Sequence, residues 1–195
     1  MGSLTQPEYG IALRLFAYSK ASLLYSLEGL TDADLAWQPK PGVCPIGWHA
    51  GHIGHFRGAL MWFFDPEPDW DNLGAFLPFG YGSDPDATRA LIPPWPELVQ
   101  MIQEDWRLFR QRFEGFKTVD FSQPAPLNNA DGETLFEMCH RITWHADHHT
   151  GQICTLREML DKPIFPRPPF GTLLRRNWSR PSTTGWECIL SAIDE

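Results

Sequence analysis

The histidines of this 195-residue chain fall into two short windows, and this clustering constrains the fold more than any other feature. Three lie in the first window and four in the second: His49, His52, His55, His140, His145, His148 and His149. Folding alone does not require such gathering, whereas a metal site needs several ligands that converge on one point. The fold is therefore expected to bring the two windows side by side.

The second window has the spacing that presents ligands on one face of a helix. His145 and His149 are four residues apart, so on a helix they lie about one turn apart and share a face. Gln152 continues that face, whereas His148 points about 100° away from His149 and is expected beside the site or at the surface. One such pair also arises by chance on solvated faces. A second histidine cluster on another helix favours metal binding, because two helices can supply the three ligands of an open site.

Apolar residues recur at helical spacing in four segments of the chain. These segments run from Tyr9 to about Leu27, from Cys44-Pro45 to Asp65-Pro66, from Trp95 to about Phe116, and from Thr134 to about Leu160. The sequence therefore predicts an all-α fold, a four-helix bundle over about 9–160 in a single domain spanning 1–195. Residues 161–195 are expected to form a mostly irregular tail of unassigned role.

A long connection, Asp65 to Pro94, separates the second and third helices and is rich in proline, glycine and aromatic residues. It is long enough to return the chain along the whole bundle, so that these two helices run parallel. Long connections in compact domains are usually functional or disordered, and the aromatic residues here argue against disorder. We therefore expect it to cover the bundle near the histidines, with Trp70, Phe79 and Tyr81 lining a substrate cavity.

Composition argues against several classes of protein. The formal net charge is −8 and the chain has no basic run, which argues against nucleic-acid binding. The four cysteines form no CxxC pair and no disulfide framework. The sequence opens on no signal peptide, and its longest apolar run, Ala59 to Phe64, is too short to span a bilayer. We expect a soluble, cytoplasmic protein that binds neither nucleic acid nor membrane.

Three groups of residues carry a resemblance to a known family. They are Leu30-Thr31-Asp32 with Trp37, Pro39, Pro41 and Gly42; Trp48-His49-Ala50-Gly51-His52-Ile53; and His145 and His149 with Gly151, Gln152, Ile153, Leu156 and Arg157. Together they resemble the DinB-like (DinB/YfiT) superfamily over residues 10–160. The resemblance implies a four-helix bundle that binds a divalent metal ion, such as zinc, nickel or iron, through three histidines. By motif, these ligands correspond to His52, His145 and His149.

The same resemblance implies a small-molecule substrate. The family includes metal-dependent thiol S-transferases and maleylpyruvate isomerases, which makes a low-molecular-weight thiol one candidate. Three neutral imidazoles leave a coordination position open for water, thiolate or substrate oxygen. Gln152 is a candidate to orient that ligand. Asp147 is a candidate acceptor for an imidazole N–H, with a solvated charge as the alternative.

Other residues near the motifs have more than one interpretation. His49, His55 and His148 are candidates to support the site or contact substrate, and a purely structural role is equally open. Trp48 and Trp144 are expected in the core. Cys44, at a helix start, is expected to be a plain buried thiol rather than one with a depressed pKa.

Two functions remain open at the level of sequence. The first is a metal-dependent enzyme that adds a thiol to a small electrophile or moves it between substrates. The second is a non-catalytic metal- or partner-binding module, such as a stand-alone relative of the amino-terminal domain of the sulfoxide synthases of ergothioneine biosynthesis. Those synthases carry a glutamate at the position of Gly151, and they continue into a large second domain that these residues do not include. The oligomeric state is open, with a homodimer as one alternative.

Overall fold

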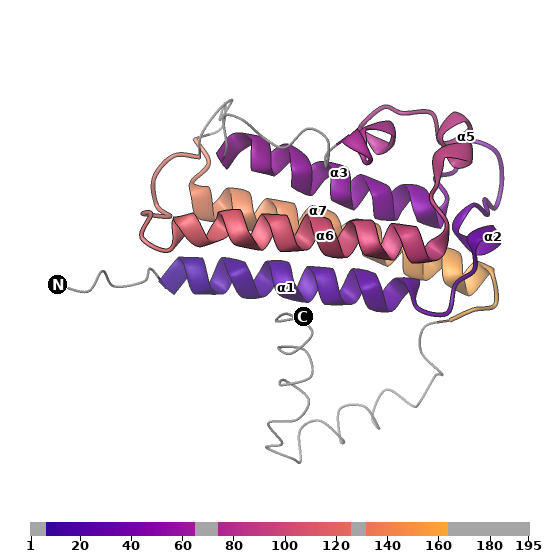
Figure 1. Ribbon diagram of the computed structural model, residues 1–195, viewed down its shortest axis with the longest axis horizontal. Helices are drawn as coiled ribbons and strands as arrows, with labels where there is room; N and C mark the ends of the chain where they lie inside the picture. Colours follow the sequence, from indigo (N-terminus) through magenta and orange to yellow (C-terminus); the bar gives the residue numbers. More distant parts are fainter. Residues whose placement is uncertain (1–6, 65–73, 126–131, 164–195) are drawn as a thin grey trace, which may run out of the picture.

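The structure, a computed structural model, describes residues 7–64, 74–125 and 132–163 (Figure 1). Its four long helices pack as a bundle and are α1 (Pro7–Leu27), α3 (Ile46–Phe64), α6 (Trp95–Phe113) and α7 (Leu135–Met159). Within the described ranges no β-strand occurs, only an isolated antiparallel bridge between Pro124 and Thr134. The predicted all-α bundle is confirmed, while the tail beyond residue 163 lies outside the described residues.

Helices α1 and α7 run in one direction along the bundle, and α3 and α6 run in the other (Figure 1). Helix α7 packs against both α1 and α3, and α3 also packs against α6. The predicted parallel course of the second and third long helices is therefore confirmed. From residue 74 onward, their connection carries three short helices, η1 (Leu77–Phe79), α5 (Pro85–Thr88) and η2 (Arg89–Leu91). None of the helices in the described ranges is both long and apolar enough to cross a membrane.

Two helices begin with a reciprocal cap that the sequence encodes. At the start of α7, the Thr134 hydroxyl accepts a hydrogen bond from the Glu137 N–H at 3.2 Å, and the Glu137 carboxylate accepts one from the Thr134 N–H at 2.8 Å. The short helix α2 (Asp32–Leu35) begins in the same way with Thr31 and Asp34. Each cap satisfies backbone donors that the first turn leaves unpaired.

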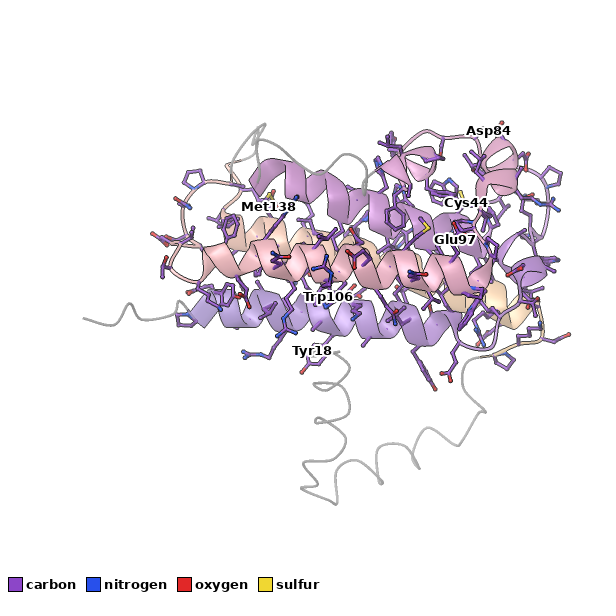
Figure 2. The ribbon with its side chains drawn as sticks, in the orientation of Figure 1. Tyr18, Cys44, Asp84, Glu97, Trp106 and Met138 are labelled. Atoms are coloured by element: carbon purple, nitrogen blue, oxygen red, sulfur yellow. The ribbon has the colours of Figure 1, made fainter. Side chains whose placement is uncertain are left out.

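The core divides into two apolar clusters toward opposite ends of the bundle; Met138 lies near one end and Cys44 near the other (Figure 2). The first cluster is largely aromatic and includes Tyr9, Phe16, Phe109, Phe113 and Phe121. The second is aliphatic and includes Leu23, Leu27, Ile46, Ile53, Leu98, Ile102 and Ile153. The clusters meet along α7 at the turns that carry the second histidine window.

The end of α7 is tied to the end of α1 through Arg157. Its buried guanidinium donates to the carbonyl oxygens of Ser26 and Glu28 at 3.0 and 2.8 Å. These carbonyls belong to the last turn of α1 and the residue after it, which have no partner further along the helix. Lys162, just beyond α7, also forms an ion pair with Asp34 at 2.5 Å. These contacts fix the position of α7 along the bundle, and hence that of its histidines.

Candidate metal centre

Helix α3 presents glycines where the connection to α6 packs onto it. A Cβ atom at Gly51 would lie 2.5 Å from the Phe79 ring, and one at Gly54 would lie 2.6 Å from the Phe76 ring. Both phenylalanines are almost fully buried. Only the missing side chains allow this close approach, which brings the backbone of η1 directly over the first histidine window.

His52 from α3 and His145 and His149 from α7 converge on one point. Their candidate ligand nitrogens all lie within 4.8 Å of one another. The Nε2 atom of His145 lies 3.3 Å from Nε2 of His52 and 3.2 Å from Nε2 of His149. Two nitrogens bound to a tetrahedral zinc at about 2.0–2.1 Å would lie about 3.3 Å apart, so the two separations from His145 match such an ion. The structure thus brings together the three histidines that the motifs singled out.

Two of the three rings are oriented by hydrogen bonds on the side away from this point. Nδ1 of His52 lies 2.6 Å from the carbonyl oxygen of Phe79, which can only accept, so Nδ1 carries the proton and Nε2 keeps its lone pair. Nδ1 of His149 lies 3.0 Å from Nδ1 of His49, and the His49 imidazole also makes a hydrogen bond to the backbone of Cys44. If His49 donates to Cys44, its Nδ1 accepts from His149, which leaves the Nε2 lone pair of His149 facing the other two rings.

Aromatic packing fixes the planes of the imidazoles. The Trp48 ring stacks on His52 with centroids 4.6 Å apart and an interplanar angle of 11°, and Phe56 stacks on His145 at 3.9 Å. Trp48 is buried, as expected, and its indole N–H donates to the Ser83 hydroxyl at 2.9 Å. These two stacking contacts restrict the rotation of the His52 and His145 rings.

Burial keeps the imidazoles of this centre neutral. Desolvation is the largest cause that lowers the pKa values of His145 to about 4 and His149 to about 3, and neighbouring imidazoles add to it. Burial likewise lowers the pKa of His49 to about 4. It also lowers that of His52, against the opposing effect of the hydrogen bond to Phe79. Neutral imidazole is the form that binds a metal, so the centre is ready for one at neutral pH.

The outer face of α7 carries residues that do not reach this centre. His148 is exposed and stacks against Trp144 with ring centroids 5.9 Å apart, in agreement with the direction expected from helix geometry. Trp144 is 63% exposed, so its expected place in the core was wrong. Being four residues before His148, it shares the same outward face. Asp147 is also exposed, and in the described part of the chain it hydrogen-bonds to no imidazole.

The remaining candidates lie around the centre. His55 hydrogen-bonds to the backbone of Phe76, which raises its pKa against the larger lowering effect of burial. The side-chain oxygen of Gln152 is buried and has no hydrogen-bond partner among the described residues. The thiol of Cys44 is half-buried and its pKa is raised by desolvation, as expected for an unreactive cysteine.

One part of the connection between α3 and α6 contacts the histidine centre, and another part does not. Phe79 is buried and supplies the carbonyl oxygen that orients His52, whereas Tyr81 is 99% exposed and therefore lines no cavity. Trp70 lies outside the described residues. Sequence reasoning missed the Phe79 carbonyl, because a backbone atom leaves no signal in the residue type. It also assigned no role to Phe56, although its spacing of four residues from His52 places both on one face.

Fold and centre together define a helical bundle with a partly buried three-histidine cluster that fits a metal ion. The sequence profile of the DinB superfamily matches residues 15–153, and the chain belongs to this superfamily. Metal binding is a property of the superfamily, and the histidine cluster agrees with it. No curated protein matches the chain.

Proposed function

We propose that this protein is a divalent-metal-dependent enzyme that adds a low-molecular-weight thiol to a small electrophilic substrate, or transfers it between such substrates. The metal would be held by His52, His145 and His149. The observation that carries the proposal is the convergence of three Nε2 atoms with Nε2–Nε2 separations of 3.2 and 3.3 Å. Three protein ligands leave a position for an external one, which distinguishes a catalytic metal from a four-ligand structural site.

The chemistry needs a thiolate at neutral pH. A divalent metal supplies this when bound, because it lowers the pKa of a thiol that binds to it. In the transfer, the thiol loses its proton, and its sulfur forms a bond to the electrophilic carbon. In a transfer, that carbon then releases its leaving group with the electron pair of the broken bond. In an addition, the electron pair displaced from that carbon passes to the neighbouring atom, which takes up the proton.

The protein's own residues bind the metal ion and orient its ligands and the substrate. The Phe79 carbonyl holds the Nδ1 proton of His52 on the outer side, and His49 does the same for His149 when its own proton is donated to Cys44. Both Nε2 lone pairs then face inward. The unpartnered side-chain oxygen of Gln152 follows His149 by three residues, close to one helical turn, and is available to accept a hydrogen bond from a bound substrate. An amide oxygen suits an N–H or O–H group of the substrate better than a thiolate, which offers no proton.

The metal part of the proposal is tested by elemental analysis of protein purified without added metal. We expect about one divalent ion per chain in the wild type and less than about a tenth of that in His52→Ala, His145→Ala or His149→Ala, because an open site has only three protein ligands to begin with. His148→Ala is the matched control on the same helix and should keep its metal. Loss of metal in His148→Ala but not in His149→Ala would show that a different face of α7 binds the ion.

The thiol part is tested on cobalt-substituted protein. A thiol that occupies the open position should change the visible spectrum, because a sulfur ligand replaces water. Consumption of the thiol with an added electrophile should follow in the zinc- or nickel-loaded protein. A protein that binds metal but shows neither effect with any low-molecular-weight thiol would instead be a non-catalytic metal-binding module.

A further inference from the structure

A small cavity borders His145, and neither His52 nor His149 is among the residues that line it. Its walls come from α1, α3 and α7, and it offers about 10 Å³ to the centre of a water molecule. Among the lining residues are Ser19 and His145. The Ser19 hydroxyl oxygen and Nδ1 of His145 are both buried, and neither has a hydrogen-bond partner among the described residues.

We propose that one ordered water molecule occupies this cavity and joins the Ser19 hydroxyl to Nδ1 of His145, which makes Ser19 a positioning residue for the metal centre. The inference rests on the proposed metal site. A water molecule needs about 10–15 Å³ for its centre and two to four polar partners, and the cavity meets the lower limit of the volume. Two unpaired polar atoms on one such cavity are the usual sign of a buried water.

The cavity offers this water further partners. Thr143 donates its hydroxyl proton to the Cys139 carbonyl at 3.0 Å and keeps lone pairs that can accept from the water. Arg57 also lines the cavity, and its hydrogen bond to Asp105 uses one of its five N–H groups. The water can therefore accept from His145 and donate to Ser19 without leaving its other positions unpaired.

The carboxyl group of Asp147 does not remove the need for the water. It lies close enough to the Ser19 hydroxyl for this neighbour to lower its pKa, while partial desolvation of the carboxyl group, the larger effect, raises it. The contact does not meet the geometry of a hydrogen bond. A hydroxyl has one proton and two lone pairs, so Ser19 can face Asp147 and still accept a proton from the water.

The water would complete a pattern that the other two histidines already show. A metal-bound imidazole has its proton on the remote nitrogen and almost always donates it to a carboxylate, a backbone carbonyl or a water. His52 has the Phe79 carbonyl on that side and His149 has His49, whereas Nδ1 of His145 has no hydrogen-bond partner among the described residues. A bridging water is nearly as good a partner as a direct one. Through this water, Ser19 on a third helix would hold the Nδ1 proton and the orientation of the His145 ring.

The first experiment compares metal affinity in Ser19→Ala and Ser26→Ala. Both serines are buried on α1, but the Ser26 hydroxyl donates to the Leu23 carbonyl at 2.6 Å. Competition with a chelator for zinc should give a dissociation constant about 10- to 100-fold weaker in Ser19→Ala, as expected when the partner of a ligand is lost. Ser26→Ala should stay within about threefold of the wild type. Circular dichroism of both variants checks that the bundle is intact.

A second readout follows the His145 proton itself. In zinc-loaded protein with labelled histidine, the Nδ1–H resonance of His145 should be protected from exchange with solvent in the wild type. It should broaden or shift in Ser19→Ala and remain unchanged in Ser26→Ala. An Ser19→Ala variant with unaltered resonance and zinc affinity within threefold of the wild type would overturn the proposal.

A high-resolution crystal structure of the wild type tests the water without any variant. We expect one water peak within hydrogen-bonding distance of both Ser19 Oγ and His145 Nδ1, with or without metal. An empty cavity, or a side-chain atom that fills it, overturns the inference even if Ser19→Ala does not fold. A wild type that binds no metal would instead defeat the proposed function while leaving the water peak in place, so the two failures are distinguishable.

Discussion

Single nitrogen atoms determine how the histidine centre is held. Each of the three imidazoles points Nε2 inward, and the partner of its Nδ1 differs from ring to ring: a carbonyl oxygen for His52, another imidazole for His149, and none among the described residues for His145, which borders a cavity. Such outer partners fix the tautomer and raise the basicity of a ligand. The contribution of each ring to metal affinity therefore depends on a residue that does not touch the ion.

His49 provides the first test at this scale. Replacement by leucine keeps an apolar side chain in the position but removes the acceptor for Nδ1–H of His149. We expect zinc affinity to weaken by about 10- to 100-fold, as is typical for loss of such a partner. Chelator competition measures it, with His140→Leu as a control, since His140 lies on the exposed face of α7. Equal affinities of the two variants would remove His49 from the centre.

The metal-free protein should lose stability as the pH falls from 7 to 5. The folded-state pKa values of His49, His145 and His149 lie at about 4, 4 and 3, below the ordinary value of 6.5. The unfolded chain therefore takes up protons below pH 6.5 that the folded chain refuses until about pH 4, so stability is complete above pH 6.5 and is lost below it.

Asp105 acts in the opposite direction over part of this range. Burial raises its folded-state pKa to about 6, against the lowering effect of Arg57, so below pH 6 the folded chain holds a proton that the unfolded chain lacks. Three histidines outweigh one carboxyl group. After a discount for partial exposure, we expect a net loss of about 2 kcal/mol between pH 7 and pH 5. Urea denaturation of chelator-treated protein measures it, and a stability that stays constant or rises toward pH 5 contradicts the histidine pKa values.

At the scale of elements, the glycines of α3 allow the segment that precedes α6 to pack closely against the helix that carries His52. Replacement of Gly51 by alanine would place a Cβ atom 2.5 Å from the Phe79 ring. The ring must move, and with it the carbonyl that orients His52. We expect Gly51→Ala to cost about 1–3 kcal/mol, the usual effect of overpacking, and to weaken metal binding.

Gly151→Ala is the matched control for this substitution. Gly151 is also inside a long helix, but it is exposed and a Cβ atom there meets nothing within 4 Å. Alanine should therefore stabilise α7 by about 1 kcal/mol, the difference in helix propensity. Urea denaturation and zinc competition on both variants separate the two effects. A Gly51→Ala protein as stable as Gly151→Ala would show that η1 does not pack on α3.

Much of this arrangement is readable from sequence because it depends on local rules. Apolar periodicity predicts the long helices to within a few residues, and the 100° step per residue places His148 on the outward face. The same step, applied to Trp144, would have placed it on the surface, where it is 63% exposed. The expectation that Trp144 is buried took account only of its large aromatic side chain. The carbonyl of Phe79 and the His49–His149 contact depend on tertiary packing, which residue types do not encode.

At the scale of the whole molecule, the core is divided so that neither half depends on the histidines. In the aromatic cluster the rings pack directly against one another, as Phe16 and Phe109 do with centroids 4.7 Å apart. The aliphatic cluster contains residues with almost no exposure, such as Leu27 and Leu98. The histidine layer lies where the two clusters meet. At the end of the bundle that holds the aliphatic cluster, Arg157 bonds to the Ser26 carbonyl and Lys162 to Asp34, and neither contact involves a metal.

The metal-free protein should therefore remain a cooperatively folded helical bundle. Zinc-finger domains need the metal to fold because their apolar core is too small, whereas here two clusters are buried without it. Metal should stabilise the fold only by mass action, RT ln(1 + [L]/Kd), which is about 2.7 kcal/mol at a hundredfold excess over Kd. Circular dichroism after chelation and thermal melts at several zinc concentrations measure both quantities. Loss of helical signal on chelation at pH 7 would make the ion a structural one and would remove the argument for an open catalytic position.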